Sequence, residues 1–335
     1  MGIVMSRFNI VSFIAAAGIV LAVGCITATP QAEAQLAQET VVIEEAALPE
    51  EPQPARGELV TKALAVAYPR RIEKAEFRDD DWALLMDGVW YYYAGGRFLP
   101  EEMLEKADEY SGSFYLYNYQ RELPPWREPS PEQAARFSGN DSNNRNNTRN
   151  TDGENDRPRI QRQRSHFFSE GLWRAGSRDE SSRQVKSVNF LGNAVTVHSD
   201  IVEVLSLIEE RIMAAATADP QLQSWITGIG EIHGWNWRNV AGSQSRSYHS
   251  YGIAIDILPK SLGGKETYWQ WAAQRGREWW NIPYADRYHP PNAVIKAFEA
   301  YGFIWGGKWV AFDTMHFEYR PEVLFLNGLE LITLQ

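Results

Sequence analysis

The sequence is poor in cysteine, histidine and positive charge. Its 335 residues include one cysteine, Cys25, and six histidines, so no disulfide can form within the chain. His-Glu-x-x-His, Gly-x-Ser-x-Gly and P-loop patterns are missing. Their absence excludes the commonest helix-borne zinc peptidase, the serine hydrolase elbow and the phosphate-loop enzymes. The formal charge of -10 argues against nonspecific nucleic-acid binding, because such binding needs a basic face.

The N-terminal region lacks a hydrophobic run of membrane-spanning length. Arg7 precedes an apolar run over residues 10–23, which is too short for an ordinary span and is typical of a secretory signal. The run ends in Gly24-Cys25, a pair that resembles a bacterial lipoprotein processing site. We therefore expect residues 1–25 to be a signal peptide and Cys25 to be lipidated. The segment Ala32-Glu33-Ala34 offers ordinary cleavage as the alternative.

Either processing route exports the protein to the cell envelope. Lipidation at Cys25 makes it a membrane-anchored lipoprotein, and the membrane is then a partner only through that lipid. Ordinary cleavage makes it a soluble periplasmic or secreted protein.

Composition divides the rest of the chain into four regions. Residues 26–57 are acidic and contain proline, which predicts a disordered tether. Residues 58–137 have the hydrophobic content of a folded accessory region but no recognisable chemistry. Residues 138–165 are a low-complexity linker rich in asparagine and arginine. Residues 185–335 carry the candidate catalytic residues and form the predicted enzymatic domain.

Local patterns in the sequence predict several helices and, in the accessory region, a strand. Residues 59–68 and the stretch after Asp200 show helical spacing, and Asp200 with Glu203 forms a capping-box-like start. Residues 266–280 are typical of an amphipathic helix rich in tryptophan. Residues 89–93 are typical of a strand. The aromatic side chains of the accessory region are either core or a sugar-stacking surface.

A first candidate site lies in the segment from Ser247 to Asp256. Gly252 permits a tight turn there, and Ile253, Ala254 and Ile255 predict the start of a buried strand. A carboxylate on such a strand needs a partner, because an unpaired buried charge is very costly. A metal ion would be such a partner, and a simple ion pair with a surface histidine is the alternative.

A second candidate segment follows sixty residues later, from Phe312 to Tyr319. It supplies His316, which with His249 and Asp256 makes a three-ligand set suited to Zn²⁺ with a fourth position for water. Asp313 remains as a candidate general base. Asp313 and His316 can face one ion only if a bend lies between them, since residues three apart on a strand point to opposite faces. Glu318 alternates with His316 and is placed to accept a hydrogen bond from it.

Together, the two segments resemble the VanY-type zinc peptidases. These are D-alanyl-D-alanine carboxypeptidases and L-alanyl-D-glutamate endopeptidases that act on peptidoglycan. The Ser-x-His-x-x-Gly-x-Ala-x-Asp motif matches over residues 247–256. The second motif matches with Asp313 where many members have glutamate, and with Met315 where some have proline. The resemblance covers about residues 185 to 335.

The resemblance implies an α+β fold of the hedgehog/DD-peptidase type, with an N-terminal extension. A small antiparallel sheet flanked by helices would carry the zinc ligands. An upstream arginine of the family binds substrate and polarises the scissile carbonyl, and here Arg238 resembles it, with Arg246 as the competitor. Ser247, as a fixed position of the first motif, is expected to contact substrate.

The implied function is zinc-dependent hydrolysis of peptidoglycan stem peptides. Carboxypeptidase and endopeptidase activity both remain open, and the wording Asp-x-x-His-Phe-Glu favours the endopeptidase branch. The alternative from another class is a wall-binding lipoprotein that keeps zinc without turnover. Asp313 argues against that alternative, because a structural zinc needs no additional carboxylate.

Overall fold

The computed structural model describes residues 53–112, 163–241, 243–309, 311–328 and 331. These residues belong to one compact unit, Gln53–Gln335. The predicted signal peptide, the lipidation of Cys25, nearly all of the tether and most of the linker therefore lie outside the described residues. The predicted boundaries of the regions stay predictions. Among the helices described, none combines the length and apolar character that crossing a membrane requires.

The first described part, residues 53–112, is a helix followed by a small antiparallel sheet. Its strands lie in the order β1-β2-β3-β4, so each pairs with its neighbour along the chain. Its elements are α1 (Gln53–Ala67), β1 (Lys74–Arg78), β2 (Asp81–Met86), β3 (Val89–Tyr92), β4 (Leu99–Pro100), the 3₁₀ segment η1 (Glu101–Glu109) and β5 (Tyr110–Ser111).

The described chain resumes with short helices, a hairpin and two longer helices. The elements up to the first strand of the second sheet are β6 (Gln163–Arg164), α3 (Phe167–Trp173), α4 (Arg178–Gln184), β7 (Val185–Phe190), β8 (Asn193–His198), η2 (Ser199–Ile201), α5 (Val202–Ala216), α6 (Pro220–Thr227) and β9 (Ile229–His233). The expected capping box before α5 does not form. Instead, the His198 ring accepts a hydrogen bond from the backbone N–H of Asp200, which satisfies one of the helix's free donors.

The remaining elements complete the second sheet and its flanking helices. They are η3 (Tyr248–Tyr251), β10 (Ala254–Pro259), α7 (Trp269–Gln274), η4 (Trp279–Asn281), η5 (Tyr284–Asp286), α8 (Asn292–Ala300), β11 (Phe303–Trp305), η6 (Gly306–Lys308), β12 (His316–Tyr319) and α9 (Pro321–Leu326). The single helix predicted over residues 266–280 is wrong, because α7 ends at Gln274 and Gly276 has a φ of 73°.

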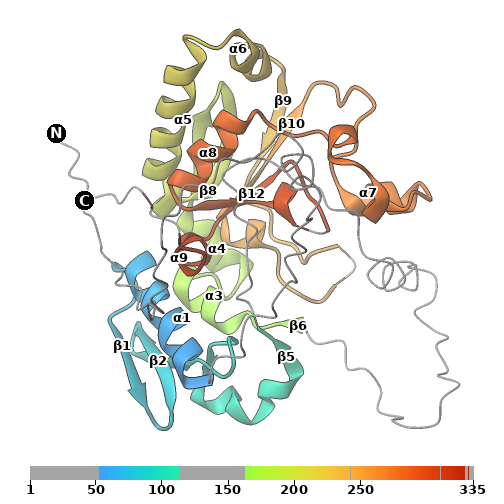
Figure 1. Cartoon of the computed structure of the whole chain (residues 1–335). Helices are drawn as coiled ribbons and strands as arrows, with labels where there is room; N and C mark the ends of the chain where they lie inside the picture. The colour runs from blue at the N-terminus through green and yellow to red at the C-terminus, as the bar shows by residue number, and fades with distance from the viewer. Residues whose placement is uncertain (1–52, 113–162, 242, 310, 329–330, 332–335) are drawn as a thin grey trace, which may run out of the picture. The chain divides into compact units, whose positions relative to one another are not determined.

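The second sheet has the strand order β11-β12-β10-β9, and all its pairs are antiparallel. One of its faces packs against helices. Phe317 of β12 stacks on Phe298 of α8 with ring centroids 4.1 Å apart, and α8 in turn packs against α5 (Figure 1). Polar side chains gather on the opposite face. This arrangement confirms the predicted α+β class with a small antiparallel sheet.

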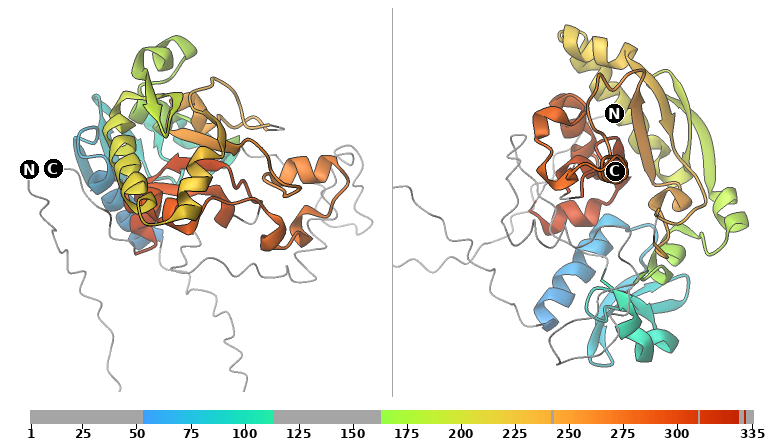
Figure 2. Two further views of the ribbon diagram at one scale, coloured as in Figure 1. Left: turned by 90° about the horizontal axis from the view of Figure 1, so that it is seen from above. Right: turned by 90° about the vertical axis from the view of Figure 1, so that its right-hand side faces the viewer.

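Residues 53–112 share a hydrophobic core with the rest of the unit. Val60, Leu64 and Tyr68 belong to the same buried cluster as Ile255 and Phe317. Arg71 donates hydrogen bonds to the carbonyl oxygens of Gly171 and Leu172 on α3. In Figure 2 the blue and teal segments of residues 53–112 lie together against the green segments that follow residue 163.

Candidate metal centre

The sheet register places Asp256 beside His316. The two residues are directly opposite in the antiparallel pair of β10 and β12, and opposite residues point to the same face. Ile255 faces the other way, toward the core, and is fully buried. Because side chains alternate along a strand, Glu318 shares the face of His316. Three ionisable groups therefore meet on the sheet face opposite α8.

His249 reaches the same face from the turn before β10. It lies in η3, and Gly252 then reverses the chain with a φ of 72°. The carbonyl oxygen of Gly234 accepts a hydrogen bond from Nδ1 of His249 at 2.6 Å. A Cβ at Gly234 would come within 2.1 Å of the Thr196 carbonyl oxygen, so this approach requires glycine. Nε2 of His249 is thereby left to face the cluster.

The potential ligand atoms are close enough to hold one ion. Nε2 of His249 lies 3.2 Å from Oδ2 of Asp256, and Nδ1 of His316 lies 2.9 Å from Oδ1 of Asp256. All three ligand atoms fall within 4.8 Å of one another. Tetrahedral bonds of about 2.0 Å separate ligand atoms by roughly 3.3 Å, so these spacings are near those of a zinc site.

One unpartnered atom supports the fit to a metal ion. Nε2 of His249 is buried and makes no hydrogen bond, despite its closeness to Asp256. Native proteins rarely leave buried polar atoms unpaired. A cation between the imidazole and the carboxylate would satisfy both groups. Asp256 and His316 are each 8% exposed, so the candidate centre has access to solvent.

Strong electrostatic coupling links the potential ligands. Burial alone would raise the pKa of Asp256, but the neighbouring His249 and His316 outweigh burial and hold this pKa well below its usual range. Burial opposes the charged form of His316, yet its hydrogen bonds to Asp256 and Glu318 raise its pKa well above normal. The carboxylate surroundings thus favour positive charge at this position.

Asp313 lies beside the cluster because the chain bends before β12. A turn at Thr314 and Met315 separates it from His316, which supplies the bend that a shared site requires. Oδ1 of Asp313 is buried and has no hydrogen-bond partner. Burial raises the pKa of Asp313 to about 7, against the opposing effect of the His316 charge. The role of Asp313 as a general base stays a prediction.

Arg238 and Arg246 differ in the groups that they face. The positive charge of Arg238 acts on Asp313 and on Tyr268, and its side chain is exposed. The guanidinium of Arg246 instead lies 4.0 Å from the centre of the Trp237 ring, and its charge acts on Glu170. These electrostatic effects favour Arg238 as the arginine near Asp313, and its role in substrate binding stays a prediction.

Ser247 has a local structural role. Its side chain is buried, and its hydroxyl accepts a hydrogen bond from the His249 backbone N–H at the start of η3. A cap of this kind helps to fix the position of His249. The contact with substrate expected for Ser247 stays a prediction.

Sequence reasoning missed three groups that surround the centre. They are the Gly234 carbonyl, Tyr268 and Trp309. Tyr268 forms an isolated antiparallel bridge with Asp313, and burial together with that carboxylate raises its pKa to about 12. The ring of Trp309 lies 5.5 Å from that of His316. No periodic pattern marks these residues, because each reaches the centre through a loop.

Comparison with known proteins assigns two parts of the chain. Residues 241–319 match a family model described as D-alanyl-D-alanine carboxypeptidase, and this range contains both motifs. Residues 60–114 match another, described as a domain of unknown function. No solved structure matches the chain. The first match confirms the resemblance that the two motifs predict.

Proposed function

We propose, on the premise that residues 241–319 belong to the VanY-type peptidase family, that the protein is a zinc-dependent peptidase of bacterial cell-wall peptides. Its substrates in this proposal are peptidoglycan stem peptides. The metal ligands are His249, Asp256 and His316.

The observation that carries this proposal is the combination of a candidate metal-binding cluster with an additional carboxylate, one of whose oxygens is buried. His249, Asp256 and His316 converge on one point, and Asp313 lies beside them with an unpartnered oxygen. A structural zinc site is closed by its ligands, whereas a catalytic site keeps a position for water. A neighbouring base serves only the second kind of site.

Each residue of the site then has a chemical task. Zinc, when bound, supplies a water molecule whose pKa is lowered toward about 7. Asp313 takes a proton from the attacking water and passes it to the leaving amine. The guanidinium of Arg238 stabilises the negative charge that develops on the scissile carbonyl oxygen, or holds a substrate carboxylate.

The bond that is cut separates two versions of this proposal. The description of the matched family favours removal of a terminal D-alanine. The aspartate at position 313 favours the endopeptidase version instead. The products differ in mass, because the first releases one alanine and the second divides the stem after its first residue.

Digestion of purified muropeptides, followed by mass spectrometry, tests the proposal. We expect cleavage that stops with a chelator and returns with added zinc. His249→Ala should abolish it, whereas His166→Ala, at a histidine whose ring stacks on Phe167, should not. Zinc-loaded wild-type protein that cuts no muropeptide would refute the enzymatic function and support the wall-binding alternative.

Export through the N-terminal segment is part of the proposal. The apolar run and Gly24-Cys25 support it, and Cys25 is the proposed lipidation site. Cys25→Ala should move the protein from the membrane fraction to a soluble one. If fractionation is unchanged and the mature chain begins at Gln35, ordinary signal cleavage is the correct route.

A further inference from the structure

A row of buried polar side chains extends from the metal centre toward α1. It consists of Glu318, Arg320, Glu322 and Tyr68, and none of the four is more than 6% exposed. The first three alternate in charge. Tyr68 directly follows α1 and belongs to residues 60–114, the range that matches a domain of unknown function. We refer to these four residues as the buried row.

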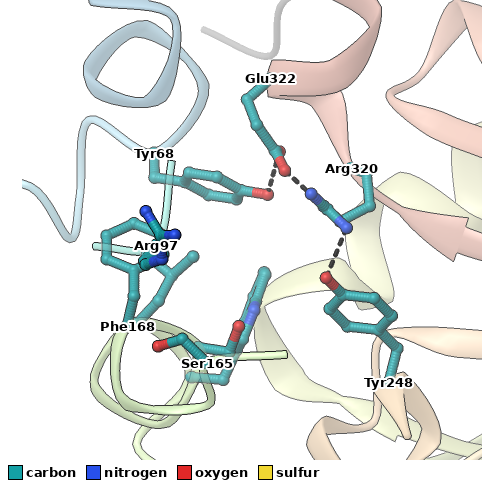
Figure 3. Close-up of a pocket in the computed structure, with 10 residues that line it drawn as sticks. Tyr68, Arg97, Ser165, Phe168, Tyr248, Arg320 and Glu322 are labelled. Carbon is teal, nitrogen blue, oxygen red and sulfur yellow. Dashed lines mark hydrogen bonds and ion pairs between the residues drawn. The ribbon is translucent and has the colours of Figure 1, made fainter. Parts of the chain in front are cut away.

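Every neighbouring pair in the buried row is in contact. Glu318 Oε2 lies 3.1 Å from Nε2 of His316, and Glu318 Oε1 lies 3.5 Å from Nη1 of Arg320. Arg320 Nε donates to Glu322 Oε1, and the Tyr68 hydroxyl donates to Glu322 Oε2 at 2.6 Å. Figure 3 shows the last two contacts.

A branch of the row reaches the other ligand-bearing segment. Arg320 also donates to the hydroxyl of Tyr248 (Figure 3), and Tyr248 directly precedes His249 in η3. A single guanidinium therefore contacts both the turn that carries His249 and the carboxylate that contacts His316. The position of Arg320 can therefore affect both proposed ligands, His249 and His316.

Tyr68 is a fixed donor at the far end of the row. Burial and the nearby Glu322 carboxylate raise the pKa of Tyr68 well above its usual value, so its hydroxyl keeps its proton. Its ring packs edge-on against Trp173 at 5.5 Å and against Tyr319 at 6.3 Å. Buried charges are costly unless each is well paired. Tyr68 supplies one of the contacts that hold Glu322 in place.

We propose that Tyr68 is a positioning residue for the metal centre, acting through Glu322, Arg320 and Glu318 on His316. This inference rests on the proposed function, since it assumes that His316 binds a metal ion. It gives residues 53–112 a task in the chemistry of the neighbouring site. Groups that hold a metal-bound histidine typically change metal affinity by about 10- to 100-fold when they are lost.

The test is the zinc affinity of the full chain, measured by competition with a chelator. Tyr68→Phe removes one hydroxyl, and we expect the zinc Kd to rise about threefold to tenfold, because Tyr68 acts through three intermediates. The visible spectrum of the cobalt-substituted protein should also shift. The control is Tyr288→Phe, which removes a hydroxyl that accepts a hydrogen bond from Trp225 and is not part of the buried row. Its zinc Kd should stay unchanged.

A second variant tests the row in case Tyr68→Phe folds poorly. Glu322→Gln keeps an oxygen acceptor for Tyr68 but removes the negative charge opposite Arg320. Like Tyr68→Phe, it should raise the zinc Kd, and its circular dichroism spectrum should be unchanged.

A double-mutant cycle separates positioning from general stability. In a Glu318→Gln background the row is interrupted beside His316 and only the branch through Tyr248 remains, so Tyr68→Phe should raise the zinc Kd by a smaller factor than it does in the wild type. Additive effects, or an unchanged Kd in Tyr68→Phe and Glu322→Gln, would overturn the inference alone. Wild-type protein that binds no zinc would overturn the proposed function and this inference with it.

Discussion

The two imidazoles of the candidate centre would present different nitrogens to a metal ion. His249 donates through Nδ1 to the Gly234 carbonyl, which leaves Nε2 for the metal. His316 has Glu318 at Nε2 and Asp256 at Nδ1, so Nδ1 is the nitrogen that faces the centre. Each ring is therefore oriented by its own acceptor, which is how proteins usually fix the tautomer of a metal-bound histidine.

At the residue scale, Asp313→Asn distinguishes a base from a ligand. Its size is nearly unchanged, and three other groups hold the metal, so zinc content should stay near that of the wild type. Loss of a general base costs about 10²- to 10⁴-fold in rate, and kcat for muropeptide cleavage should fall by that factor. If zinc is lost together with activity, Asp313 is a ligand. If activity is retained, another group is the base.

His198 predicts how stability depends on pH. Its ring is buried, accepts a hydrogen bond from the Asp200 N–H and lies 3.2 Å from the Trp173 carbonyl oxygen, and burial lowers its pKa. The unfolded chain, with a histidine pKa of about 6.5, then binds protons that the folded protein does not. The free energy of unfolding should therefore fall as pH drops from about 6.5 through the lowered pKa.

Urea unfolding with chelator present, at several pH values, measures this dependence. His198→Gln should flatten the curve below about pH 6.5 relative to wild type. A wild-type curve that does not fall on acidification faster than that of His198→Gln would contradict the prediction.

At this scale the sequence predicts groups that share a regular element or a motif. The alternation of His316 and Glu318 on one strand is such a case. The contacts of Gly234 and Tyr268 with the centre were not predictable, because they join loops that are distant in the chain. Spacing also could not rank Arg238 against Arg246, since only the folded chain shows which of them faces Asp313.

At the scale of elements, the joint between η3 and β10 sets the position of His249. Gly252 combines a φ of 72° with a close approach, because a Cβ there would lie 2.8 Å from the His198 backbone nitrogen. Both backbone strain and a clash would follow from a side chain at this position. The neighbouring strand pair supplies Asp256 and His316, so the joint decides whether the third ligand meets the other two.

Gly252→Ala should therefore destabilise the protein by more than about 3 kcal/mol and weaken zinc binding. Gly192→Ala is the matched control, because Gly192 has a φ of 79° but no atom within 4 Å of a Cβ. It should cost only the left-handed backbone penalty of about 1 to 2 kcal/mol. Equal losses in urea unfolding would mean that the clash at Gly252 is relieved by a shift of its neighbours.

Sequence patterns found the elements with strong local signals. The sequence predicts the helix α1 and the strand β3 near their observed positions, and it predicts the strand β10 after Gly252. The helix predicted over residues 266–280 is wrong, because the tryptophans of this segment pack against one another across a loop. Trp269 and Trp279 lie 5.0 Å apart although Gly276 interrupts the helix between them. Tertiary packing outweighed helical periodicity there.

At the scale of the molecule, residues 53–112 and the described residues from 163 onward share one hydrophobic core. We therefore expect a single unfolding transition, with tryptophan fluorescence and circular dichroism changing together.

Leu64 is 1% exposed, and Leu64→Ala should lower the free energy of unfolding by about 2 to 5 kcal/mol. The control is Leu59→Ala on the same helix, 54% exposed, with an effect within about 0.5 kcal/mol. Two transitions, of which Leu64→Ala lowers only one, would show independent domains.

The strand order of the second sheet also governs when the site can be assembled. His316 follows Asp256 by sixty residues, and β12 pairs between β10 and β11. Contacts between such distant segments form after local ones. Before β12 has been made and inserted, the folded part of the chain holds only two of the three proposed ligands, so a site formed by all three cannot exist. The proposed site is therefore completed by the insertion of a single strand, β12, between two strands that precede it in the chain.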